Sequence, residues 1–430
     1  MNSGSHTIDT SRTVAFINKL LSGYQGCNFT IKLWDGTVLQ SSPGSESLFT
    51  IIFKHPGAVR SLFFPPSEMR ICEAYFKDDY DIEGDILALL ENAERLSVRH
   101  WKLKDFLHFI VDLLRLPRDT RKKTAAEGRV ALEGEKYSAA RDKEAVQFHY
   151  DVSNEFYSLW LDERMVYSGA YFYNENESLA QSQLNKLDII CRKLQLKSGE
   201  KYLDIGCGWG ALLFHAVQNY GVDGTGVTLS KNQAAFINEK AARLGLSDRL
   251  RAEVRDYREL YAEKQFDKLS SVEMLHHVGE KKLPEYFNHL KNLLTDDGMS
   301  FHLVITSNAA KGKYKGPAYA DKYFMPDYQL IPVSKYCKQA EASGWEIVDT
   351  ENLRRHYMLT AAQWLRAMEA KHEEAAKLCG EVIYRAWRLS FALMSFGFRH
   401  NLIQMHHLLL VKSPKGKFNS PINRKIWYSA

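Results

Sequence analysis

The sequence predicts an α/β protein: a Rossmann-like, doubly wound, mostly parallel sheet with a helical insertion, preceded by a small N-terminal α+β domain. Three observations predict this fold. The apolar run 201–205 leads into glycines at alternate positions, Gly206, Gly208 and Gly210, before helix-spaced apolar residues resume. Strand-like and helix-like patterns then alternate up to residue 306. The chain of 430 residues is long enough for two or three domains.

After the glycine loop, strand patterns are separated by helical patterns, which is the order of a parallel sheet with crossover helices. Strands are expected at 201–205, 224–229, 250–256, 266–273 and 299–306. Helices are expected at 178–196, 231–244 and 283–294. Two last strands, 345–350 and 405–411, are expected to be antiparallel. The C-termini of the parallel strands form one edge of such a sheet, where ligands bind.

The N-terminal α+β domain is expected to span residues 1–115 and to offer a lipid or partner surface. Residues 28–40 alternate apolar and polar side chains around an Asp-Gly turn, a pattern typical of a β-hairpin. A third strand is expected at 48–54. The aromatic and acidic segment 73–81 is expected to be a loop packed on this hairpin, and the alternative is a surface that shapes the substrate.

The segment 116–144 carries many charges and few apolar side chains, so it is expected to link the two domains. The domain with the glycine loop is expected to span 145–430. Within it, helix-forming residues near 361–396 are expected to form a cap over the ligand site.

Composition narrows the class of protein. The net charge of +5 is weak and spread out, so we expect no nucleic-acid partner. The six cysteines are scattered, which indicates reduced thiols in the cytoplasm, and no metal site is expected. The adjacent His406 and His407 lie on a predicted strand and point to opposite faces, against joint metal binding. No signal core or bilayer-spanning stretch is found.

The glycine loop is typical of several adenosine cofactors, and the neighbouring strands discriminate between them. A dinucleotide site has an acidic residue at the end of the second strand, where this chain has Thr228 and Ser230. Instead, Asp256 ends the third strand and can accept a hydrogen bond from an adenine amino group. This combination favours S-adenosylmethionine over NAD.

Several motifs, taken together, resemble the cyclopropane-fatty-acid synthase family, which includes the mycolic acid methyltransferases. They occur in one order between residues 148 and 411. The matching segments are His149–Asp151, Tyr167–Ser168, Ala170–Tyr171, Leu203–Gly210, Gly226–Ser230, Ser271–Met274, His277–Gly279, His356–Tyr357, Thr360 and Trp364.

The resemblance implies a Rossmann-like S-adenosylmethionine-dependent methyltransferase and assigns cofactor contacts. The methionine part is expected to pack on Gly206 and Gly208 beside Asp204, with Tyr150, Tyr167 and Ser168 closing over it. Thr228 and Gln233 are expected to meet the ribose, and Asp256 and Tyr257 to border the adenine. Aromatic faces suit a sulfonium because the ring quadrupole attracts a cation.

The resemblance also implies methyl transfer to a lipid alkene, followed by proton removal by a bicarbonate that a Cys, a Glu, a His and a Tyr hold. This chain departs from that pattern: Gly169 stands at the Cys position, His276 at the Glu position and Leu303 at the His position. His302 lies one place earlier, on the opposite strand face. Tyr357 alone remains, so the use of bicarbonate is left open.

Two interpretations follow: His276 itself is the base, or the acceptor or product has changed. The catalytic candidates are His276, Tyr357, Glu273 and His277, of which His277 is expected to orient its loop or contact the substrate.

The function predicted is C-methylation of the double bond of unsaturated acyl chains, in phospholipids. The alternatives are acyl methylation or methylenation without ring closure, a small-molecule N- or C-methyltransferase, and a catalytically silent lipid- or cofactor-binding protein. The expected partner is an unsaturated acyl lipid, met from the cytoplasm at the inner membrane face. A homodimer is left open.

Overall fold

The computed structural model describes the chain apart from residues 1–2, 23, 43, 66, 94–102, 120, 122–131, 151, 262–263, 312–313, 315, 414–415, 417–420 and 429–430. The side chains of residues 3–9, 103–107, 147 and 150 also lie outside the description. The chain divides into two compact units. The first comprises Met1–Val130, Gly316–Phe324 and His372–Phe396, and the second comprises the remainder.

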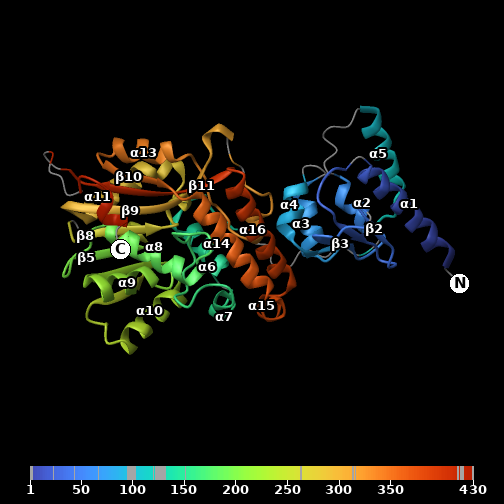
Figure 1. Ribbon diagram of the computed structural model, residues 1–430. Helices are drawn as coiled ribbons and strands as arrows, with labels where there is room; N and C mark the ends of the chain where they lie inside the picture. The colour runs from blue at the N-terminus through green and yellow to red at the C-terminus, as the bar shows by residue number, and fades with distance from the viewer. Residues whose placement is uncertain are drawn as a thin grey trace. The chain divides into compact units, whose positions relative to one another are not determined.

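The second unit contains a seven-stranded sheet in the order β10-β11-β9-β8-β5-β6-β7 (Figure 1). Its strands are β5 (Lys201–Ile205), β6 (Asp223–Thr228), β7 (Leu250–Val254), β8 (Phe266–Val272), β9 (Leu294–Ser307), β10 (Glu346–Asn352) and β11 (Ile403–Val411). The pairs from β7 through β9 are parallel, whereas β11 pairs antiparallel with both β9 and β10. The predicted fold class, including the antiparallel last strands, is confirmed.

Helices connect these strands as the hydrophobic periodicity predicts. They are α6 (Ala139–Tyr150), α7 (Asn154–Ser158), α8 (Leu179–Lys193), α9 (Ala211–Tyr220), α10 (Lys231–Arg243), α11 (Leu283–Leu293), α13 (Val333–Ala342), α14 (Arg354–Glu369) and α17 (Lys425–Tyr428). Side-chain caps fix two helix starts, because Ser178 accepts from the Gln181 amide and Ser230 from the Gln233 amide. The core between sheet and helices is apolar and includes Leu203, Leu269, Phe287 and Leu408.

The first unit contains a four-stranded sheet in the order β2-β1-β3-β4. Its strands are β1 (Thr30–Lys32), β2 (Val38–Gln40), β3 (Phe49–Phe53) and β4 (Tyr80–Gly84). Its helices are α1 (Ser3–Leu21), α2 (Ala58–Phe63), α3 (Glu68–Phe76), α4 (Ile86–Ala93), α5 (Leu103–Arg115), α12 (Ala320–Tyr323), α15 (His372–Cys379) and most of α16 (Glu381–Arg399). The hairpin is present: β1 and β2 are antiparallel and Gly36 has a φ of 90°.

The loop predicted at 73–81 is wrong: α3 covers its beginning and β4 its end. Tyr75 and Tyr80 are buried there because α16 supplies polar partners for the turn between them. Arg385 donates to the Tyr75 carbonyl at 2.9 Å and to the Asp78 carboxylate at 2.9 Å, and Arg388 donates to the Ile82 carbonyl at 3.0 Å. These partners come from the far end of the chain.

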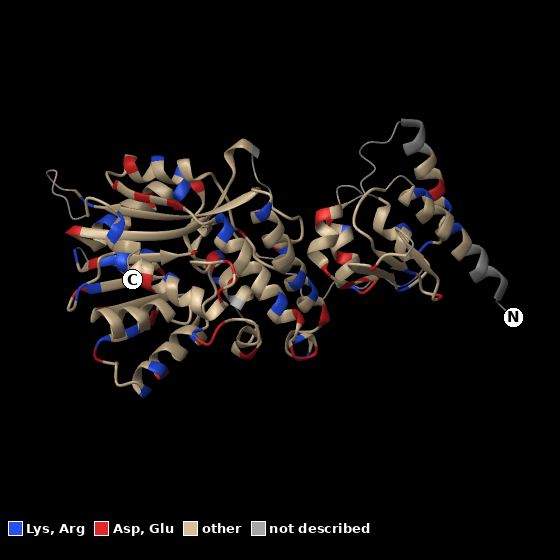
Figure 2. Cartoon of the chain, viewed as in Figure 1, with Lys and Arg blue, Asp and Glu red and all other residues tan. Residues whose placement is uncertain are grey.

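Charged side chains of both signs are interspersed over the described elements (Figure 2), as the weak net charge predicts. Among the described helices, none combines the length and the apolar character needed to cross a bilayer.

Candidate active site

The glycine loop follows β5 and turns directly into α9. Gly206, Gly208 and Gly210 have φ values of 74°, 53° and 80°, which side chains of L-residues rarely allow. A Cβ on Gly210 would lie 2.8 Å from Ile237, so this glycine allows close packing. A Cβ on Gly208 would meet nothing within 4 Å, so this glycine faces open space. The loop therefore leaves room for a ligand at Gly208.

The next strand, β6, ends in a polar pair. Thr228 donates to the Gln233 side-chain oxygen at 2.7 Å, and the Ser230 amide donates to Thr228 Oγ1 at 3.1 Å. Gln233 is buried, and its Nε2 has no hydrogen-bond partner among the described residues. Buried amide donors are nearly always paired, so this donor fits an acceptor on a bound ligand.

Asp204 lies on β5, just before the glycine loop. Its side chain is buried next to Ser270 of β8. The Ser270 hydroxyl donates to its carboxylate. Burial raises the pKa of Asp204 to about 6, while the Ser270 hydrogen bond and the Lys186 charge act in the opposite direction.

Asp256 begins the turn after β7 and is held by a residue that the sequence analysis did not identify. Arg258 donates from its backbone amide and Nε to Asp256 Oδ1, both at 2.9 Å, and from Nη2 to Oδ2 at 2.6 Å. A carboxylate has about four lone-pair positions, so one remains for a ligand donor. Tyr257 packs edge-on against Tyr286.

Arg258 also reaches the first turn of α6 and the residues just before it. Its guanidinium donates to Asp142 at 3.0 Å and to the Tyr137 carbonyl at 3.2 Å. The Tyr137 ring lies against Gly279, where an added Cβ would approach to 2.8 Å. The residues from 132 to 144, expected to belong to a linker, thus make specific contacts with loops at the C-terminal ends of β7 and β8.

The tyrosine motifs form an aromatic wall. Tyr167 stacks on His149 with ring centres 5.6 Å apart, and its hydroxyl lies 3.2 Å from His149 Nε2. Trp160 and Trp364 each lie 5.3 Å from the Tyr167 ring. The predicted contact Tyr150 lies outside the described side chains. The adjacent Ser168 is buried, and Lys186 Nζ donates to its hydroxyl at 2.7 Å.

The second feature of the site is a partly buried carboxylate. Glu273 follows β8, and its backbone amide donates to the Leu303 carbonyl at 2.8 Å. Gly169 N donates to Glu273 Oε1 at 2.6 Å, and the Tyr357 hydroxyl donates to Oε2 at 2.9 Å. Burial raises the pKa of Glu273 to about 7, against these two hydrogen bonds and the Lys186 charge.

Glu273 adopts a left-handed backbone conformation with a φ of 56°. A non-glycine residue in this region costs on the order of 1–2 kcal/mol, and such strain clusters at functional sites. The strained backbone and the two hydrogen bonds together orient the carboxylate. The sequence made Glu273 a catalytic candidate, but no periodicity reveals its left-handed turn or its two hydrogen-bond donors.

Gly169 could not carry a side chain here. A Cβ at this position would lie 2.4 Å from the Tyr357 ring and 2.6 Å from the Met405 sulfur. Tyr357 packs on Phe398 with ring centres 4.5 Å apart. Tyr357 and Met405 therefore fill the space that a cysteine side chain would need at this position. Gly169 meets Glu273 through its backbone amide.

The histidines lie elsewhere in the core. His276 is buried and His277 is half-buried, with ring centres 4.4 Å apart, and burial lowers the pKa of both. His276 Nδ1 has no partner in the part of the chain that the structure describes. His302 lies 2.9 Å from Ser300 Oγ and packs on Tyr286 of α11. The structure joins Glu273 to Gly169 and Tyr357, and gives none of these histidines a hydrogen bond to it.

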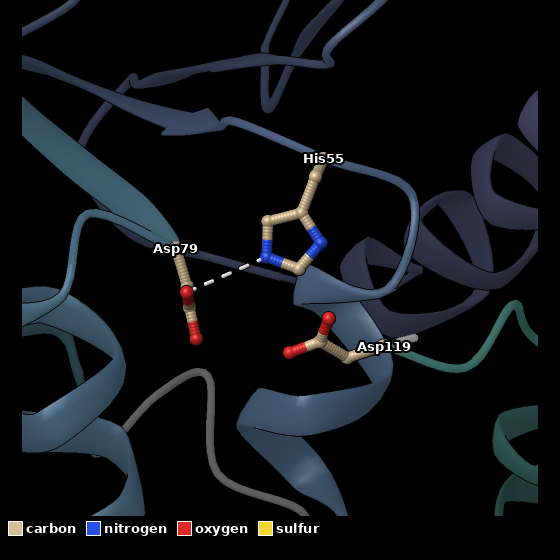
Figure 3. Close-up of side chains that lie close together, drawn as sticks. All are labelled: His55, Asp79 and Asp119. Carbon is tan, nitrogen blue, oxygen red and sulfur yellow. Dashed lines mark ion pairs between the residues drawn. The ribbon is translucent and has the colours of Figure 1, made fainter. Parts of the chain in front are cut away.

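A separate cluster in the first unit has the residue types of a metal site (Figure 3). The ligand atoms of His55, Asp79 and Asp119 lie within 4.8 Å of one another. However, Arg121 donates to both carboxylates, including Asp119 Oδ1 at 3.0 Å. This guanidinium compensates their charge and pins the segment after α5, so we base no metal proposal on the cluster.

Comparison with known proteins places these features in context. A family model described as "Mycolic acid cyclopropane synthetase" matches residues 137–408. A second model, described only as a domain of unknown function, matches residues 16–101.

Two relatives of this chain are named as methyltransferases of different lipids. A "Probable fatty acid methyltransferase" of Pseudomonas putida is 33% identical over 402 residues, covering 93% of this chain and 95% of that protein. A sphingolipid C9-methyltransferase of Komagataella phaffii is 29% identical over 355 residues, covering 79% of this chain and 69% of that protein.

Solved structures agree with these matches. A cyclopropane synthase of Mycobacterium tuberculosis superposes with a TM-score of 0.60 at 27% identity, covering 63% of this chain and 98% of that one. A mycolic acid cyclopropane synthase solved with SAH and CTAB superposes with a TM-score of 0.59 at 28% identity, with the same coverage.

Proposed function

Because the chain belongs to the mycolic acid cyclopropane synthetase family, we propose that it methylates the double bond of unsaturated fatty acyl chains, with Glu273 as the base. The family resemblance and the cofactor S-adenosylmethionine, both predicted from the sequence, are confirmed by the comparisons. The observation that carries the proposal is the partly buried Glu273 carboxylate, which Gly169 and Tyr357 orient beside an aromatic wall.

The residues around the glycine loop fit the cofactor. The open space at Gly208, the unpaired Gln233 amide and the remaining acceptor position of Asp256 suit the methionine, ribose and adenine parts respectively. When bound, S-adenosylmethionine would supply an electrophilic methyl carbon and would leave as S-adenosylhomocysteine, whose sulfur keeps the electron pair of the broken sulfur–carbon bond. The Tyr167 ring, held by His149 and the neighbouring tryptophans, offers a π face to a positive charge.

The acceptor double bond uses its π electrons for the new carbon–carbon bond, which leaves a cation on the acyl chain. Glu273 then takes one proton. Loss of that proton from the added methyl carbon closes a ring, and loss from a neighbouring chain carbon leaves a branched alkene. Buried aromatic side chains, including Trp160 and Trp364, exclude the water that would capture the cation.

Glu273 suits the role of base better than His276 does. A general base works best when its pKa lies near the working pH, which is the range to which burial raises the pKa of Glu273. Burial lowers the pKa of His276 well below its ordinary value, which makes its ring a weaker base. The Glu273 carboxylate already occupies the donors Gly169 N and Tyr357 Oη, so we propose that the reaction needs no bicarbonate.

The acyl substrate is supported by the relatives. The two relatives described above are named for fatty acids and for sphingolipids, and one similar structure contains CTAB, a detergent with a single long alkyl chain. We propose that the enzyme meets its substrate at a membrane surface. Small-molecule methylation and catalytic silence remain as outcomes of the assay below.

The test uses the full chain with methyl-labelled cofactor in bicarbonate-free buffer. Vesicles of monounsaturated phospholipid are the substrate, and vesicles of the saturated analogue are the control. We expect label and a gain of one CH₂ in the unsaturated acyl chains alone, with hydrogenation separating ring from branch. Label confined to an added small amine, or no transfer despite cofactor binding, would overturn the proposal. A need for added bicarbonate would overturn the role of Glu273.

A further inference from the structure

Helix α8 carries a buried lysine that is linked to the proposed base through Ser168 and Gly169. Lys186 is 2% exposed, and its Nζ donates to Ser168 Oγ at 2.7 Å. Burying an ammonium group is costly unless carboxylates compensate it. Lys186 forms no ion pair within 4 Å of a carboxylate in the described chain, so its compensation comes from carboxylates farther away.

Three carboxylates on different elements, two of them buried and one partly buried, attract this ammonium group electrostatically. Glu273 lies after β8, Asp204 ends the glycine-loop strand β5, and Asp162 follows α7. Asp162 has a second cation, since Arg164 lies 3.6 Å from its carboxylate. Tyr357, the other titratable group beside Glu273, donates a hydrogen bond but brings no positive charge. Lys186 is the cation that acts on the Glu273 carboxylate.

The same helix holds the segment that presents Gly169. Gln183, one turn before Lys186, donates to the Ser168 carbonyl at 2.7 Å. Lys186 donates a hydrogen bond to the Ser168 hydroxyl. Gly169, the residue after Ser168, donates a hydrogen bond from its backbone amide to Glu273. A single side chain on α8 thus contributes both a charge near the base and a contact that fixes one of its hydrogen-bond donors.

We propose that Lys186 is a positioning residue, which keeps the Glu273 carboxylate ionised and holds the Ser168–Gly169 segment that orients it. This inference rests on the proposed role of Glu273 as the base. Without the lysine charge, a buried carboxylate is harder to ionise, because the unfavourable desolvation remains and the attraction is lost.

The test compares Lys186→Met with wild type in two pH titrations. The first follows the infrared band of the protonated Glu273 carboxyl group, isolated by subtracting the spectrum of Glu273→Gln. The second follows kcat/KM for acyl methylation. We expect the Lys186→Met midpoint to move to higher pH in both, by roughly one pH unit, so that ionised Glu273 is about tenfold scarcer at pH 6.

Lys193 provides a matched control, because it is a second buried lysine on α8, with Asp349 and Glu351 as its partners at 2.7 and 2.5 Å. We expect Lys193→Met to lower thermal stability and leave the Glu273 midpoint unchanged. An unchanged midpoint in Lys186→Met, or an equal movement in Lys193→Met, would overturn the inference. The infrared titration needs no turnover, so an inactive wild-type protein would refute the proposed function and leave this test intact.

Discussion

The glycine loop and the Glu273 turn lie at the C-terminal ends of β5 and β8, two neighbouring parallel strands, yet they are built differently. The glycine loop is a local feature: three left-handed glycines within five residues make the turn. The Glu273 turn depends on distant residues, since its carboxylate accepts from Gly169 and Tyr357, 104 and 84 positions away. The turn proposed to contact the cofactor thus depends on one stretch of sequence, whereas the proposed base is oriented by residues that only the fold brings together.

The largest expected effect concerns the base. Glu273→Gln keeps the shape of the side chain and removes its ability to take a proton, so turnover should fall by about 10²- to 10⁴-fold. The affinity for S-adenosylhomocysteine, measured by calorimetry, should stay unchanged because the glycine loop is untouched. His276→Ala is the matched test of the histidine predicted from the sequence. Loss of turnover in His276→Ala, with turnover kept in Glu273→Gln, would return the role of base to His276.

The second prediction concerns the glycine loop. Gly208→Ala places a methyl group in the open space of the proposed cofactor site, so cofactor affinity should fall at least about tenfold. Gly199→Ala is the control, since Gly199 also has a positive φ, of 81°, with nothing within 4 Å of an added Cβ. Both variants should lose on the order of 1–2 kcal/mol of folding free energy. Equal cofactor affinity in the two variants would contradict this placement of the cofactor.

The third prediction is a pH profile. Since burial raises the pKa of Glu273 to about 7, kcat/KM should rise with pH below about 7 and level off above it. Tyr357→Phe removes a donor to the ionised carboxylate, so the pKa should rise further and the profile should move to higher pH by roughly one unit. Wild type and variant should therefore differ more at pH 6 than at pH 9. A parallel loss at every pH would mean that Tyr357 does not act through Glu273.

The smallest effect is expected at the adenine edge. Arg258 is partly exposed, so Arg258→Gln should weaken cofactor binding only about two- to fivefold, with a smaller difference at high salt. Arg255→Gln is the control, because Arg255 pairs with Glu253 on the surface of the same turn. Calorimetric titrations at low and high salt measure both. A similar loss of cofactor affinity in Arg255→Gln would mean that Arg258 acts only through its general positive charge.

Sequence reasoning succeeded where a signal is local or periodic. The parallel strands, the capped helix after Ser230 and the hairpin at Gly36 follow from side-chain periodicity and turn chemistry. Reasoning of this kind failed at residues 73–81, where polar and aromatic residues hid a helix and a strand. Their burial depends on Arg385 and Arg388, more than 300 positions later, whose hydrogen bonds no local pattern can reveal.

By itself, the sequence determined the sheet, the cofactor loop and the family, because these depend on backbone geometry and on the order of motifs. Only the tertiary structure showed that Glu273, with a left-handed backbone, points its carboxylate at Gly169 N and Tyr357 Oη. It also buried Lys186, which looks in sequence like an ordinary helix residue, and linked it to Glu273 through Ser168 and Gly169. The physical reason is that the ionisation of a buried carboxylate depends on donors and charges that only folding brings together.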